Sequence, residues 1–150
     1  MRCIKGLLVL VFLVFTGEAW GQSCTVTTIA VNFGNYITSA AYPSDTTGYV
    51  DITCASGIPY TVRLDAGQNS GGGFNPRKMR LSGGGDTLNY NLYRDSARTE
   101  VWGDGTSNTY IQTGVGTGGT AHLIVYGRIP GGQNVRVGLY TDAVTVIVEW

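Results

Sequence analysis

Charged and reactive side chains are scarce in this sequence of 150 residues. Only 13% of the residues are charged, and ten Lys and Arg balance ten Asp and Glu, which leaves a formal net charge of zero. A neutral chain has no electrostatic basis for binding nucleic acid or an acidic membrane surface. The single histidine, His122, is the one possible histidine base, and no G-x-S-x-G nucleophile motif accompanies it. We therefore expect a protein that is not an enzyme.

Motifs for cofactors and metals are equally weak. Residues 114–119 (GVGTGG) match the glycine spacing of a dinucleotide site, but such a site must open a helix, and no helical period follows. Asp104 lies between two glycines without the neighbouring carboxylates that calcium needs, so it indicates a plain turn. Arg77, Lys78 and Arg80 form a basic cluster without interleaved aromatic residues, which favours an exposed loop or strand edge. We expect no catalytic residue, no cofactor and no metal.

The long apolar run of the sequence lies at its N-terminus. Arg2 and Lys5 form a short basic region. The apolar run that follows, residues 6–15, is too short to span a bilayer. Ala19 and Gly21 then supply the small residues that signal peptidase reads. This order is typical of a secretory signal peptide that is cleaved after Ala19 or Gly21.

These features divide the chain into a signal peptide, residues 1–21, and one secreted domain, residues 22–150. About 130 residues are enough to bury a single core. After signal cleavage no stable membrane insertion is expected. The alternative of a lipoprotein acylated at Cys24 is weaker, because residues 21–23 lack the leucine that such a signal carries.

Cysteine is rare as well. Cys3 leaves with the signal peptide, so Cys24 and Cys54 remain in an exported chain and have one possible pairing. We predict a disulfide between them, which in the chain-entropy model contributes roughly 3–4 kcal/mol to stability. A metal site is the weaker alternative, because it needs more ligands than His122 can add.

Between its ends the chain alternates short apolar-polar segments with glycine-rich turns and shows no helical period. A polar loop is expected to end at Gly48, and a hairpin is expected between Cys54 and Tyr60. The expected strands are residues 24–31, 49–54, 60–65, 79–81, 88–93 and 121–129, followed by a strand at the C-terminus. Six to eight strands with a turn about every ten residues predict an all-β, immunoglobulin-like sandwich, with a closed barrel as the alternative.

The C-terminal strand, residues 138–150, is the most apolar. One of its faces carries four large apolar residues at period two: Val144, Val146, Val148 and Trp150. Its β-branched residues favour a strand. A bare apolar edge invites aggregation, so the sequence predicts that this strand lies either inside a sheet or beside an edge that something else fills.

Several segments together resemble the spore coat protein U domain family. They are Cys24 with residues 32–36 (NFGNY), residues 50–54 (VDITC), residues 88–93 (LNYNLY) and residues 125–142, which begin VYGRIP and end GLYTD. The resemblance covers essentially all of the mature chain. The family includes Csu-type subunits of archaic chaperone-usher pili. The resemblance implies an incomplete immunoglobulin-like sandwich that lacks its last strand and is completed by a donor strand.

The resemblance also implies partners and a location. The partners are a periplasmic chaperone, an outer-membrane usher and a neighbouring pilus subunit that donates a strand alongside the four apolar residues of the C-terminal strand. The protein would cross the periplasm and end on the extracellular surface or in a pilus that serves adhesion and biofilm growth. Polymerising subunits carry a donor extension before their first cysteine, whereas only Gln22 and Ser23, or at most residues 20–23, would precede Cys24 here. This favours a terminal (tip) subunit; the alternative is a stand-alone secreted coat or surface-binding protein.

Overall fold

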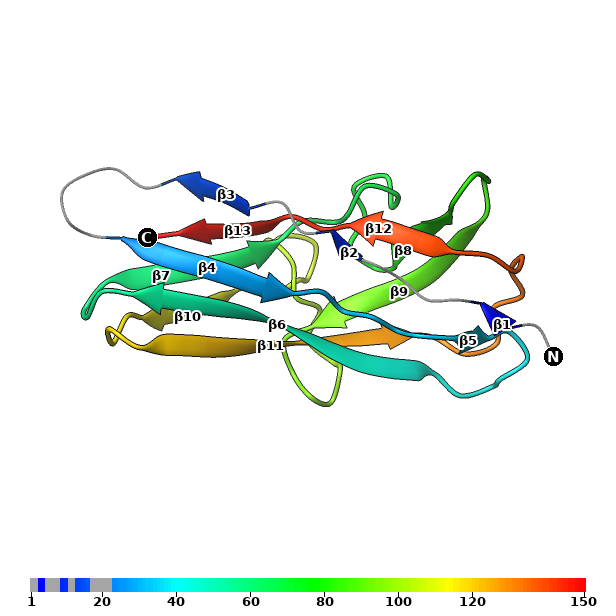
Figure 1. The fold of residues 1–150 in the computed structure, drawn as a ribbon, viewed down its shortest axis with the longest axis horizontal. Helices are drawn as coiled ribbons and strands as arrows, with labels where there is room; N and C mark the ends of the chain where they lie inside the picture. Colours follow the sequence, from blue (N-terminus) through cyan, green and yellow to red (C-terminus); the bar gives the residue numbers. More distant parts are fainter. Residues whose placement is uncertain (1–2, 5–8, 11–12, 17–22) are drawn as a thin grey trace.

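The computed structural model describes residues 3–4, 9–10, 13–16 and 23–150, and all regular structure in these residues is β-strand. The strands form a two-stranded pair, a four-stranded sheet and a seven-stranded sheet. In Figure 1 the two larger sheets overlie one another along the long axis of the molecule. The predicted all-β, immunoglobulin-like sandwich is confirmed. No helix in the described ranges has the length and apolar character that crossing a membrane requires.

The seven-stranded sheet has the order β2-β12-β8-β9-β11-β6-β4. Its strands are β2 (Val9–Leu10), β12 (Tyr140–Ala143), β8 (Arg77–Leu81), β9 (Thr87–Tyr93), β11 (Thr120–Ile129), β6 (Ser44–Cys54) and β4 (Cys24–Ile29). The four-stranded sheet has the order β10-β7-β13-β3. Its strands are β10 (Gln112–Val115), β7 (Pro59–Leu64), β13 (Val146–Glu149) and β3 (Leu13–Thr16). The short pair joins β1 (Cys3–Ile4) to β5 (Tyr36–Ile37).

The core lies between the two larger sheets. Both contribute side chains at period two, as expected for strands with one buried face. Residues that are at most 3% exposed include Val62 and Leu64 of β7, Val146 and Val148 of β13, Val50 and Ile52 of β6, Met79 of β8 and Leu88 of β9. Trp102 is fully buried among them, and its indole N–H donates to the carbonyl oxygen of Val62 at 3.1 Å. Each large apolar side chain buried here contributes ~1.5–3 kcal/mol.

The strand β6 begins earlier than the sequence predicts. The polar residues up to Gly48 are not a loop, because residues 44–48 pair antiparallel with residues 125–129 of β11. This half of β6 places no side chain in the core before Gly48, so the hydrophobic alternation that marks a strand is missing. A side chain at Gly48 would overlap the carbonyl oxygen of Ile29, which explains why glycine fits there.

Two connections cross from one sheet to the other where the sequence predicts continuity. The hairpin predicted between Cys54 and Tyr60 is wrong, because β6 belongs to the seven-stranded sheet and β7 to the four-stranded sheet. The turn between them contains Gly57, whose φ of 84° favours glycine. The single C-terminal strand is also two strands, β12 and β13, which lie in different sheets on either side of residues 144–145. Residues 23–150 therefore contain ten strands, more than the six to eight predicted.

Cys24 and Cys54 form the predicted disulfide. They are direct partners in the antiparallel pairing of β4 with β6, with their Cα atoms 4.1 Å apart. The bond joins the first residue of β4 to the last residue of β6. Cys3 lies in β1, opposite Ile37 of β5, and the predicted cleavage region after Thr16 lies outside the described residues.

Replacing Cys24 by serine should lower the free energy of unfolding by ~2–5 kcal/mol, because the loop between Cys24 and Cys54 is no longer closed in the unfolded chain. Urea denaturation of the oxidised protein would measure the change. Cys3→Ser, which leaves the Cys24–Cys54 bond in place, is the matched control. Equal denaturation midpoints for the two variants would contradict the prediction.

Candidate functional site

The C-terminal strand β13 presents an apolar face to the core. Val144, two residues before the strand begins, and Val146 and Val148 within it are each at most 3% exposed. Trp150 is partly buried and packs against the same core cluster. The residues between them are partly exposed, so the strand has one buried and one outer face. A partner that pairs with β13 would extend the sheet over these buried valines.

Both backbone edges of β13 are paired in the full chain. Residues 146–149 run antiparallel to residues 61–64 of β7 on one side and parallel to residues 13–16 of β3 on the other. Figure 1 shows β3 beside β13 at the outside of the sheet. The sequence predicts a targeting segment without structure at the N-terminus, whereas the structure places β3 on the edge of β13. The outer edge of β13 thus accepts an apolar strand from a distant part of the sequence.

A narrow apolar seam separates β13 from β4, the last strand of the other sheet. Residues 28–31 on one side and Val144 and Val146 on the other line a cavity of about 20 Å³. Leu64 and Leu92 also line it. A cavity of this size holds about one water molecule, but an apolar lining leaves such a cavity dry. β13 and β4 therefore lie close together across an apolar seam.

Asp65, directly after β7, fixes the junction between β12 and β13. Its carboxylate oxygen Oδ1 accepts hydrogen bonds from the backbone N–H groups of Thr145 and Gly67, each at 2.9 Å. Its own backbone N–H donates to the carbonyl oxygen of Thr145 at 3.0 Å. The chain can leave one sheet after Ala143 and enter the other at Val146 because the backbone groups between them are hydrogen-bonded.

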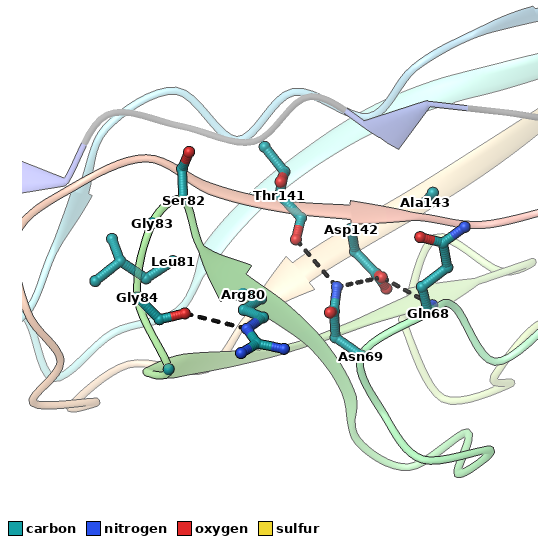
Figure 2. A pocket seen from close by; sticks show the side chains of 11 residues that line it. Gln68, Asn69, Arg80, Leu81, Ser82, Gly83, Gly84, Thr141, Asp142 and Ala143 are labelled. Carbon is teal, nitrogen blue, oxygen red and sulfur yellow. Dashed lines mark hydrogen bonds between the residues drawn. The ribbon is translucent and has the colours of Figure 1, made fainter.

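A polar hollow of about 890 Å³ lies beside β12. Figure 2 shows its lining, in which the Asn69 amide donates to the carbonyl oxygen of Thr141 at 3.3 Å and to Asp142 Oδ1 at 2.8 Å. The backbone N–H of Gln68 donates to the same Oδ1 at 3.0 Å. The Tyr90 hydroxyl donates to the other carboxylate oxygen, Oδ2, at 2.6 Å. These bonds hold the loop after β7 against β12.

Burial is the main influence on the pKa values of Asp142 and Tyr90. The loss of solvent around Asp142 raises the pKa of its carboxyl above the ordinary value, and the hydrogen bond from Tyr90 and those from Gln68 and Asn69 act against that rise. Burial is also the main reason that the pKa of the Tyr90 hydroxyl lies well above its usual value, and the nearby Asp142 adds to it. The tyrosine therefore remains a hydrogen-bond donor throughout the physiological range.

Arg77 is a buried cation, and the prediction that it lies in an exposed loop or strand edge is wrong. It is fully buried in β8 instead of exposed, whereas Arg80 in the same cluster is exposed. Its guanidinium donates to the carbonyl oxygen of Asp65 at 2.7 and 3.0 Å, to that of Trp102 at 2.7 Å and to Asn91 Oδ1 at 2.9 Å. Burial lowers the pKa of Arg77, but an arginine stays charged.

The sequence around Arg77 contains one indication that its side chain faces the core. Met79 is fully buried two residues later, and residues two apart in a strand share a face. The charge of Arg77 obscured this period. Through the carbonyl of Asp65, Arg77 supports the same residue that clamps the β12–β13 junction.

The remaining chemical candidates do not assemble into a second site. Nδ1 of His122 on β11 shares a hydrogen bond with Oδ1 of Asp51 on β6, on the outer face of the seven-stranded sheet. Asp104 Oδ1 accepts from the backbone N–H of Thr106 at 2.8 Å and from its hydroxyl at 2.7 Å, which is the predicted turn. Residues 114–115, the start of the GVGTGG run, belong to β10. Among the described residues no three His, Cys, Asp or Glu side chains gather as metal ligands would.

Residues 11–147 match the family model of SCPU, the Spore Coat Protein U domain. The chain belongs to the spore coat protein U domain family. Its similarity to a curated relative agrees: Protein U of Myxococcus xanthus is 31% identical over an alignment of 143 residues, which covers 87% of this chain and 79% of Protein U. The family match extends over most of the sandwich and ends at the second residue of β13.

Among solved structures, this family member resembles a chain in the CsuC–CsuE chaperone-tip adhesion subunit pre-assembly complex from archaic chaperone-usher Csu pili of Acinetobacter baumannii. The TM-score is 0.63 at 23% sequence identity. The alignment covers 86% of this chain but only 40% of that chain, so the present protein spans less than half of its length. The likeness shows a shared fold.

Replacing Tyr90 by phenylalanine should raise the pKa of Asp142 further, because it removes a donor that lowers this pKa. When folding raises the pKa of a carboxyl, the protein loses stability as the pH rises through the pKa of that carboxyl in the folded state. The variant's deficit in unfolding free energy should therefore be small at about pH 3 and reach ~1.5–3 kcal/mol at about pH 7, the scale of a hydrogen bond to a charged group. Urea denaturation at both pH values would measure it.

Tyr140→Phe is the matched control for this pH dependence. The Tyr140 hydroxyl donates at 3.0 Å to the backbone carbonyl oxygen of Arg136. A backbone carbonyl does not titrate. The deficit of Tyr140→Phe should be the same at both pH values. A Tyr90→Phe deficit that is equally independent of pH would show that Asp142 is not coupled to Tyr90.

Proposed function

We propose that this protein is a secreted structural subunit of a chaperone-usher type pilus or surface coat, assembled by donor-strand complementation. The observation that carries the proposal concerns β13. Its inner face is apolar and buried, and its outer edge pairs with β3, a strand from the other end of the chain. Membership of the spore coat protein U domain family supports it. So does the fold shared with a chain that was solved in a complex of a pilus chaperone and a tip adhesion subunit.

The mechanism is the addition of a β-strand. An incoming strand supplies hydrogen bonds to the outer backbone groups of β13 and covers the seam between β13 and β4. The residues that form this donor-strand and chaperone-binding edge are Val144, Val146, Val148 and Trp150. A periplasmic chaperone would occupy the edge during transit, an outer-membrane usher would receive the complex, and a neighbouring subunit would provide the final strand.

The N-terminal segment supports a terminal position of the subunit in the assembly. If residues 1–21 are removed as a signal peptide, Gln22 and Ser23 are left before Cys24, which is held at the start of β4 by its disulfide. Two residues are too short to form a donor strand. The domain over residues 22–150 would then accept a strand without giving one, as a terminal or tip subunit does.

A stand-alone secreted coat protein is the second candidate function. The description of the family, Spore Coat Protein U domain, supports it. A coat protein that works alone needs a domain that is stable without a partner strand. The two candidates therefore differ in whether an added strand stabilises the mature domain.

Fusing an apolar donor strand after Trp150 through a flexible linker should raise the melting temperature of the protein lacking residues 1–21. Each valine that the donor helps to bury contributes up to ~1.5–3 kcal/mol, which is a large part of a domain's ~5–15 kcal/mol stability. Val146→Asp should abolish the gain, because it places an unpaired charge under the donor. Differential scanning calorimetry of the fused and unfused proteins would measure both effects.

Ile147→Asp is the matched control, because Ile147 lies on the outer, partly exposed face of the same strand. It should keep most of the gain from the fused donor. An unfused domain that is monomeric and as heat-stable as the fused form would reject donor-strand completion and favour the stand-alone coat protein.

A terminal subunit should not form homopolymers. After removal of residues 1–21 and of any bound chaperone, the purified protein should remain free of linear fibres in electron micrographs, because residues 22–23 cannot reach along a neighbour's β13. Adding a donor extension of about ten apolar-alternating residues before Cys24 should produce fibres. Fibres formed by the unextended protein would rule out the tip assignment.

A further inference from the structure

The N-terminal segment follows the C-terminal strands in one continuous register. Val9 and Leu10 of β2 pair with Asp142 and Ala143 of β12, and residues 13–16 of β3 pair with residues 146–149 of β13. The partners differ by the same 133 positions in both pairings (142 − 9 and 146 − 13). All of these pairs are parallel. Residues 9–10 and 13–16 thus keep one offset along residues 142–143 and 146–149, although β12 and β13 lie in different sheets.

The composition of residues 9–16 suits this position. The segment reads VLVFLVFT and has no charge, glycine or proline, and its valines and phenylalanines favour extended strands. Its register places Leu13 opposite Val146 and Phe15 opposite Val148. Those two valines are among the most buried residues of the core. The segment therefore has the chemistry of a donor strand.

We infer that residues 9–16 occupy the β12–β13 edge for as long as they remain attached, and that loss of the N-terminal segment opens this edge to a partner's strand. The inference rests on the proposed function, because it names the first occupant of the same edge. Peptidase-catalysed hydrolysis of one peptide bond between β3 and β4 consumes one water and leaves a carboxylate on the segment and a new amino group on the domain. The cut segment is then held by non-covalent contacts alone.

Covalent attachment explains why the segment would exclude other strands. A tethered segment acts at an effective concentration of about a millimolar. A strand on another molecule at about a micromolar concentration must therefore bind roughly a thousandfold more tightly to displace it. Cleavage removes this advantage, so the edge changes from closed to available without any change in the fold of residues 23–150. A subunit that keeps its N-terminal segment is self-capped.

The test uses the full chain, oxidised and folded in vitro, with Val14→Pro as the opening variant. Proline lacks the N–H that a paired strand needs, so it should release β3 from β13. Glu18→Pro, between β3 and β4, is the matched control. Hydrogen exchange of those amides of residues 146–149 that face β3, but not of those that face β7, should be at least about tenfold faster in Val14→Pro than in the parent and in Glu18→Pro. Equal exchange in all three proteins would overturn the inference.

Binding of a labelled peptide with the sequence of residues 9–16 and a lysine tag for solubility separates this inference from the proposed function. The peptide should bind Val14→Pro at least about tenfold more tightly than it binds the parent. Equal affinity for both proteins would contradict self-capping but leave strand acceptance intact. Fast exchange in Val14→Pro without peptide binding to any variant would support the intramolecular pairing and reject an edge that accepts strands from other molecules.

A second arm covers the case in which Val14→Pro does not fold. A specific protease site within residues 17–22 of the full chain is cut after folding, and the cut protein is diluted. Peptide affinity should then rise by at least about tenfold relative to the uncut protein. Unchanged affinity and unchanged exchange at residues 146–149 after the cut would show that attachment does not control the edge.

Discussion

The outer edge of β13 is the constraint on which the structure depends. An apolar strand at the end of a sheet carries unpaired backbone groups, and these invite uncontrolled pairing with other chains. The protein meets this constraint by pairing β13 with β7 on one side and with β3 on the other. The same edge that stabilises the full chain is the edge along which we propose that a partner binds, so in this proposal stability and assembly use one set of backbone groups.

A buried polar network holds that edge in place. Arg77 donates to the carbonyl oxygen of Asp65, and the Asp65 carboxylate accepts from the backbone of Thr145, at the point where the chain crosses between sheets. Asp142 is held from the other side by Tyr90 and Asn69. No buried side-chain nitrogen or oxygen among the described residues lacks a hydrogen-bond partner. A fully bonded network of this kind fixes one geometry, whereas apolar packing alone would tolerate sliding of β13.

The pairing of β3 with β13 connects folding to assembly. A strand that covers the buried valines lowers the free energy of the folded domain whether it comes from the same chain or from another molecule. The two sources differ mainly in effective concentration, which depends on covalent attachment. A pilus subunit and a coat protein of the spore coat protein U domain family could therefore share one sandwich and differ in what lies along β13.

The sequence alone was sufficient for the all-β class, the Cys24–Cys54 pairing and the face shared by Val144, Val146 and Val148, because these follow from local alternation and from a count of cysteines. It could not predict the strand at residues 44–48, whose polar side chains hide their pairing with β11. It also could not place Arg77 in the core, because a buried charge is stable only where carbonyl oxygens from distant segments surround it. The split between β12 and β13 depends on Asp65 and on the pairing of the two strands with β8 and β7. The register of residues 9–10 and 13–16 along them is decided by contacts between the two ends of the chain, and only the tertiary structure brings these distant segments together.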